Sequence, residues 1–168
     1  MPEKNPITKV MIGIGNRHRR DDGVGLEIIK RLRRFDESLL GNWSLVTCEG
    51  DLLDLIDLIS KSSHVVIMDG LISTSRVPGS IMEWDLLKEK LPLGVTPLSS
   101  HSMGLSSLID LLAVLGKKPR YFRLIGLIVA DSGYGDGLSP MVASALDQVV
   151  HKVLRILTER EIGEPIRS

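Results

Sequence analysis

The stretch Lys9–Gly25, KVMIGIGNRHRRDDGVG, joins an apolar run to a Gly-Asn turn, a basic loop and two adjacent aspartates. The apolar run, Lys9–Ile14, is short and β-branched, which predicts a buried strand that ends at the glycine turn. The following segment, Gly23–Phe35, has apolar residues at helical spacing. This order of strand, turn and helix indicates the first unit of an α/β fold, with Asp21 and Asp22 at the start of its helix.

The same alternation continues along the chain. The predicted strands are Lys9–Ile14, Trp43–Cys48, His64–Met68, Ser80–Trp84 and Tyr121–Ala130. The predicted helices are Gly23–Phe35, Asp51–Ser60 with Asp51 as its N-cap, Met103–Leu115 and Ser139–Leu157. Continuous apolar strands that alternate with helices are typical of a mostly parallel sheet covered on both faces. The sequence therefore predicts a three-layer α/β/α fold.

Length and composition limit the class of protein. With 168 residues the chain has the size of one domain, which we expect to span 1–168 with a core over 9–157 and a loose tail over 158–168. Basic and acidic residues both number 21, so the net charge gives no argument for binding nucleic acid or an anionic membrane. The apolar runs are shorter than a membrane span, the N-terminus lacks a signal core, and Cys48 is the only cysteine. We expect a soluble, cytoplasmic protein without membrane insertion.

Two aspartates and one histidine are the main candidates for chemistry. Asp22 follows the first predicted strand, Asp69 follows the third, and His101 lies in a serine-rich loop before a helix. In parallel sheets ligands bind outside the carboxyl ends of the strands, so these side chains are expected to meet there. Two carboxylates and one imidazole suit a divalent transition metal and leave coordination positions open. The sequence predicts a metal site formed by these three residues.

Each candidate also has a purely structural interpretation. Asp21 and Asp22 can serve as the cap and the acidic first turn of a helix, and we expect one of them, Asp21, to have that role. Asp69 can be a solvated residue after a strand. A single histidine such as His101 is more often structural than a ligand.

Other chemistries fit the sequence less well. The Gly13-Ile14-Gly15 turn resembles a dinucleotide fingerprint, but His18 replaces its third glycine and nearby carboxylates would repel a pyrophosphate. The sequence has no Gly-x-Ser-x-Gly motif. A Cys48–His101 nucleophilic pair is disfavoured because an apolar strand before Cys48 and Glu49 after it would raise the pKa of the thiol.

With these motifs the chain resembles the hydrogenase maturation proteases, endopeptidases that remove a C-terminal extension from the large subunit of nickel-iron hydrogenases. Their opening signature, Gly-x-Gly-Asn, a short loop and Asp-Asp-Gly-x-Gly, is matched by Gly13, Gly15, Asn16, Asp21, Asp22, Gly23 and Gly25. Asp69 matches the family's strand-end aspartate, and His101 matches its histidine before a Leu-rich helix. The segment GLSPMVASALDQVV resembles the closing helix, so the resemblance covers about Lys9 to Leu157.

The resemblance implies a twisted, mostly parallel five-stranded sheet between helices and a site with metal ligands Asp22, Asp69 and His101. Recognition and aspartic-type catalysis are not separable among these three residues. The implied substrate is a large-subunit precursor that carries its own nickel, and zinc or cadmium could occupy the site in vitro. A monomer is expected. Because the sequence offers no obvious activated nucleophile, a non-proteolytic nickel-sensing or chaperone-like module is the alternative function.

Three segments depart from the family pattern: the basic loop RHRR at 17–20, CEGDLL at 48–53 and GLIVADSGYGDGLS at 126–139. They leave open which hydrogenase is the partner. Arg17, Arg19 and Arg20 border the predicted cleft, where cationic side chains could steer an acidic partner surface. The same loop also fits a solvated segment without a docking role.

Overall fold

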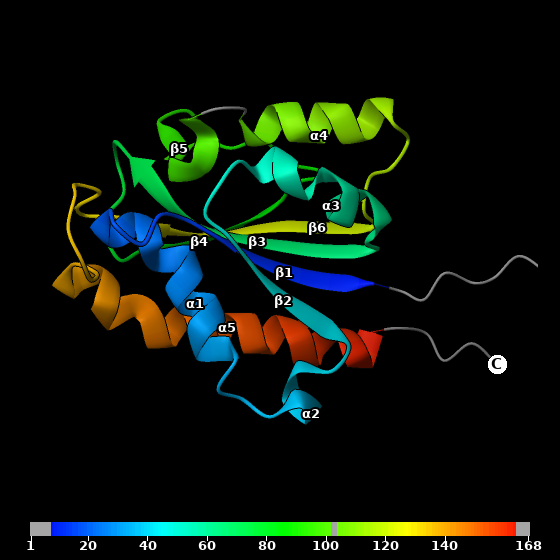
Figure 1. Cartoon of the computed structure of the whole chain (residues 1–168), viewed down its shortest axis with the longest axis horizontal. Helices are drawn as coiled ribbons and strands as arrows, with labels where there is room; N and C mark the ends of the chain where they lie inside the picture. Colours follow the sequence, from blue (N-terminus) through cyan, green and yellow to red (C-terminus); the bar gives the residue numbers. More distant parts are fainter. Residues whose placement is uncertain (1–7, 102–103, 164–168) are drawn as a thin grey trace, which may run out of the picture.

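The computed structural model describes residues 8–101 and 104–163, with the backbone alone at 100–101 and 159–163 (Figure 1). Its sheet has the strand order β2-β1-β3-β6-β4, and β5 pairs with β3. The strands are β1 (Lys9–Ile14), β2 (Trp43–Cys48), β3 (His64–Ser73), β4 (Ile81–Asp85), β5 (Val95–Pro97) and β6 (Tyr121–Ile128). β1, β2, β3 and β6 are parallel, whereas β4 and β5 are antiparallel to their neighbours. The mostly parallel sheet is confirmed, with a short sixth strand in addition to the expected five.

Helices cover both faces of the sheet (Figure 1). One face carries α1 (Val24–Leu32), α2 (Glu37–Leu40) and α5 (Pro140–Gly163), and the other carries α3 (Ile56–Lys61) and α4 (Leu105–Val114). Short 3-10 turns precede several helices: η1 (Arg20–Gly23), η2 (Leu52–Leu55) and η3 (Leu98–His101). Each face has its own apolar core, which contains side chains of α1 and α5 on one side and of α3 and α4 on the other. The three-layer prediction is confirmed.

Glycines allow α1 to approach the sheet closely. A Cβ atom at Gly25 would lie 2.3 Å from the carbonyl oxygen of Ile14 and 2.5 Å from that of Met68. At Gly15 it would lie 1.9 Å from the carbonyl oxygen of Asp22. Since no side chain fits at these distances, the glycines of the opening motif bring the turn before α1 against the ends of β1 and β3. This packing places Asp22 at the carboxyl edge of the sheet.

Some predicted boundaries are wrong. β3 continues to Ser73 instead of ending at Met68, because Leu71–Ser73 pair with β5 and residues up to Leu71 pair with β6. Asp69 therefore lies inside a strand, although pairing with β1 stops one residue before it. The closing helix runs to Gly163, so it occupies part of the predicted tail 158–168.

The second predicted helix, Asp51–Ser60, is divided between η2 and α3. Its predicted N-cap is confirmed, since a side-chain oxygen of Asp51 accepts a hydrogen bond of 3.0 Å from the backbone N–H of Leu53. The third predicted helix, Met103–Leu115, also has a different start: α4 begins at Leu105, and Met103 lies outside the described residues.

Candidate active site

Asp22 and Asp69 meet at the carboxyl edge of the sheet, where β1 and β3 end their mutual pairing. Asp22 belongs to η1 and is 8% exposed, and Asp69 belongs to β3 and is 1% exposed. The negative charge of Asp22 is one of the causes that raise the pKa of Asp69, so the two carboxylates interact electrostatically. The structure thus brings together the two acids that the sequence assigned to one site.

The surroundings of Asp69 disfavour its charged form. Burial is the largest cause and raises the pKa of this carboxyl from 3.8 to about 7, against the opposing effect of hydrogen bonds from Ser99. Ser99 donates two hydrogen bonds to Oδ2 of Asp69, one from its hydroxyl and one of 3.3 Å from its backbone N–H. The other oxygen, Oδ1, is buried and has no hydrogen-bond partner among the described residues. Such an oxygen is unfavourable unless a cation or a donor contacts it, so the Asp69 carboxyl is suited to be one ligand of a divalent metal ion.

His101 is placed only through its backbone. It is the last residue of η3, the turn that also contains Ser99, and this turn packs against β3 near Asp69. The side chain of His101 lies outside the described part of the structure. Among the side chains that are described, no three His, Cys, Asp or Glu residues form a group that could hold a metal. The histidine's part in the predicted metal site therefore stays a prediction.

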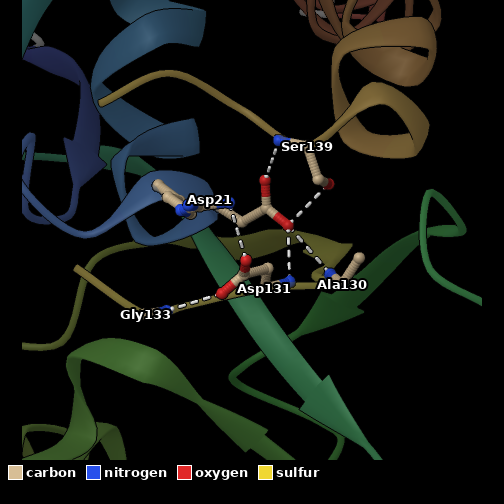
Figure 2. Close-up of polar contacts among 6 residues, drawn as sticks. Asp21, Ala130, Asp131, Gly133 and Ser139 are labelled. Carbon is tan, nitrogen blue, oxygen red and sulfur yellow. Dashed lines mark hydrogen bonds and ion pairs between the residues drawn. The ribbon is translucent and has the colours of Figure 1, made fainter. Parts of the chain in front are cut away.

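Asp21 is not the helix cap that its position suggested. It is fully buried, and within the described residues neither η1 nor α1 has a side-chain cap. Its carboxylate instead accepts hydrogen bonds from the backbone N–H groups of Ala130 (2.9 Å), Asp131 (2.8 Å) and Ser139 (2.6 Å), and from the Ser139 hydroxyl (2.8 Å) (Figure 2). Asp21 therefore joins the turn before α1 to the loop after β6 and to the start of α5. The cap prediction was wrong because these partners are more than 100 residues away in sequence.

The basic loop contacts the loop that follows β6. Arg20 forms an ion pair of 3.0 Å with Asp131, and Nε of Arg19 donates a hydrogen bond of 3.1 Å to the carbonyl oxygen of Ser132. The guanidinium of Arg19 also lies 5.3 Å from the ring centroid of Tyr134. These side-chain contacts join the two loops at the rim of the site.

Arg17 contacts the departing segment at 48–53. Its guanidinium donates hydrogen bonds of 2.5 and 2.8 Å to the two carboxylate oxygens of Glu49, and this pairing lowers the pKa of Glu49. Both side chains are exposed, so solvent screens the pair and its stabilising effect is small. They border a cavity of about 590 Å³ that also reaches Gly23 and the exposed face of α1. Each of the three departures from the family pattern is thus bonded to another of them.

Cys48 lacks the surroundings of a nucleophile. The thiol is buried at the end of β2, where burial is the main cause that raises its pKa. Its Sγ donates to the carbonyl oxygen of Asp51 at 3.6 Å. A protonated, enclosed thiol is unreactive, which agrees with the sequence-based argument against a Cys48–His101 pair.

Residues 26–156 match the family model described as HycI, hydrogenase maturation protease. The chain belongs to the hydrogenase maturation protease family. The predicted family membership is confirmed, and so is the prediction that the protein is an endopeptidase of hydrogenase maturation. The matched range begins directly after Gly25, so the opening glycine and aspartate signature lies outside the residues that the model covers.

Individual relatives agree with this result. The hydrogenase 2 maturation protease of Escherichia coli K12 is 26% identical over 152 residues, which cover 89% of this chain and 90% of that protein. A solution structure of an Escherichia coli endopeptidase superposes with a TM-score of 0.75 at 23% identity, covering 93% and 94% of the two chains. HybD from Thermococcus kodakarensis has a TM-score of 0.69 at 19% identity, covering 90% of this chain and 99% of its own. These structural likenesses confirm the fold.

The sequence did not predict the roles of Ser99 and Ser139, whose hydroxyl groups donate hydrogen bonds to Asp69 and Asp21. The only signal in the sequence was that each is a small polar residue beside a segment with a proposed function.

No helix within the described residues has the length and apolarity that crossing a membrane requires.

Proposed function

We propose that this protein removes the C-terminal extension of a nickel-iron hydrogenase large-subunit precursor after nickel has been inserted, and that it recognises the nickel directly. One observation carries the proposal: buried Asp69 presents an oxygen without a hydrogen-bond partner beside the second buried acid, Asp22. Two buried carboxylates at one sheet edge are unfavourable by themselves. A divalent cation would remove both the repulsion and the unsatisfied oxygen.

In this proposal the nickel belongs to the substrate. Asp22 and Asp69 are two of its ligands and His101 is the third, supplied by η3. Three protein ligands leave coordination positions for the precursor's own nickel-binding groups. The bridged complex is therefore expected to be much tighter than the binding of free nickel, and zinc or cadmium can take the same position in vitro.

The same residues serve recognition and catalysis in this proposal. A bound metal ion can polarise a peptide carbonyl or activate water, which supplies the activation that no described nucleophile offers. As ligands of the precursor's nickel, Asp22 and Asp69 would hold the precursor segment that is cut near the edge of the sheet. We further propose that the protein acts as a cytoplasmic monomer.

The test is cleavage of nickel-loaded and metal-free precursor, followed by intact-mass measurement. Wild type is expected to shorten only the nickel-loaded precursor, and Asp69→Ala and His101→Ala are expected to leave it uncut. Asp110→Ala, which removes an exposed aspartate of α4, is the matched control and should cleave like wild type. If a complex forms but the mass never falls, the alternative nickel-sensing function replaces the protease proposal. Efficient cleavage of metal-free precursor would refute nickel recognition.

A further inference from the structure

Ser99 donates two hydrogen bonds to a single oxygen of the Asp69 carboxylate. It lies in η3, and two of its donors, the hydroxyl and the backbone N–H, both bind the same carboxylate oxygen, Oδ2. The acceptor is 1% exposed, so water does not compete for these bonds. Hydrogen bonds in a buried setting of low dielectric constant are stronger than those exposed to water. The Asp69 carboxylate is therefore held in one orientation.

This orientation determines which oxygen is available for another partner. Because Oδ2 takes both donors of Ser99, Oδ1 points elsewhere, is buried, and makes no hydrogen bond to any described residue. A carboxylate that was free to rotate could share its two oxygens between Ser99 and the site. The fixed arrangement instead reserves one oxygen for the protein and one for a ligand.

We propose that Ser99 is a positioning residue that holds Asp69 with one carboxylate oxygen directed at the nickel. The inference rests on the proposed function. It assigns to η3 two contributions to one site, since this four-residue turn contains both Ser99 and His101. One short turn then determines where the histidine backbone lies and how the aspartate is oriented. Residues that hydrogen-bond to metal ligands usually change metal affinity about 10- to 100-fold when they are removed.

The test is a double-mutant cycle on nickel affinity. Calorimetric titration with nickel chloride is performed on wild type, Ser99→Ala, Ser99→Thr, Asp69→Ala and the double variant Ser99→Ala/Asp69→Ala. Binding of nickel-loaded precursor is measured on the same set, because the bridged complex is expected to be tighter. Ser107→Ala, an exposed serine of α4, is the control, and thermal unfolding monitors the folded state of every variant.

Ser99→Ala is expected to weaken nickel binding about 10- to 100-fold, and Ser99→Thr, which keeps the hydroxyl, to restore most of it. In the Asp69→Ala background Ser99→Ala should have no further effect, because the serine acts through the carboxylate. If Ser99→Ala does not fold, Ser99→Gly replaces it, and failure of both to fold would show a structural role and overturn the proposal.

Failure of this inference can be told apart from failure of the proposed function. If wild type binds and cleaves nickel-loaded precursor while Ser99→Ala matches it in affinity, the positioning role is refuted and the nickel-reading protease stands. An equal loss from Ser99→Ala with and without Asp69 also refutes positioning. If wild type neither binds nickel-loaded precursor nor cleaves it, both proposals fall.

Discussion

The buried carboxyl of Asp69 makes folding stability depend on pH in an unusual direction. Its pKa is raised from 3.8 to about 7 in the folded protein, chiefly by burial. Between these two values the folded state keeps a proton that the unfolded chain has released, so stability falls as pH rises through this window. A difference of about three pKa units corresponds to about 4 kcal/mol of folding free energy, because each unit is worth 1.36 kcal/mol.

Asp69→Asn removes this charge while keeping an oxygen that can accept from Ser99. The variant is expected to gain stability relative to wild type by up to about 4 kcal/mol as pH rises from about 4 to about 8. The new amide N–H₂ group lacks a described acceptor and costs about 1–3 kcal/mol, but this cost is the same at every pH. The pH dependence of the difference therefore isolates the buried charge. Processing should be lost, because an amide is a poor ligand for a divalent transition metal.

Urea unfolding followed by circular dichroism over this pH range gives the required free energies. Asp110→Asn serves as control, since its carboxyl is exposed and its unfolding curves should follow those of wild type. Parallel stability profiles for Asp69→Asn and wild type would refute the reasoning, because they would show that the folded Asp69 carboxyl titrates as in the unfolded chain.

Four other variants and one pH change test further parts of the structure. Asp21→Ala leaves three backbone N–H groups without their acceptor and should lower the free energy of unfolding by about 3 kcal/mol or more in urea titrations; a change below 1 kcal/mol would contradict its anchoring role. Asp22→Ala should keep its stability but abolish processing, as measured by intact mass, and Asp22→Glu should retain part of it. Arg17→Glu breaks the pair with Glu49 and, on the docking hypothesis, slows association with precursor; association rates equal to those of wild type at every salt concentration would exclude a docking role for Arg17. Nickel-loaded precursor should bind more weakly below about pH 6.5, because the Asp69 carboxyl, with a pKa of about 7, and an unperturbed imidazole such as that expected of His101, with a pKa of about 6.5, both hold a proton there; a flat binding profile would exclude both residues as ligands.

Local sequence pattern was sufficient to predict most of the fold. Apolar runs and helical spacing located the main strands and helices, because burial on both sheet faces demands continuous apolar strands. The two acids of the site were also predictable, since residues that follow parallel strands gather at one edge. Asp22 and Asp69 meet there as expected.

What the sequence could not give are contacts between distant segments. Asp21 binds donors beyond position 129. β5 pairs with the end of β3, but its three residues are too few to show the alternating pattern of a strand in the sequence. Arg20 and Asp131 are likewise 111 residues apart. Each of these features depends on how loops meet after the sheet has formed, and charge or polarity along the chain does not identify the partner.

Asp21 and Asp22 have different roles because they occupy successive positions of a short 3-10 turn. Asp21 turns inward and is satisfied by four donors from the loop after β6 and the start of α5. Asp22 follows it at the sheet edge, beside Asp69, where its charge adds to the effect of burial in raising the pKa of the Asp69 carboxyl. The hydrogen bonds of Asp21 thus fix the turn that places Asp22 beside Asp69. If nickel recognition is the function, a metal-free precursor offers no cation to Asp22 and to the unpartnered oxygen of Asp69, so this arrangement favours the substrate that already carries its nickel.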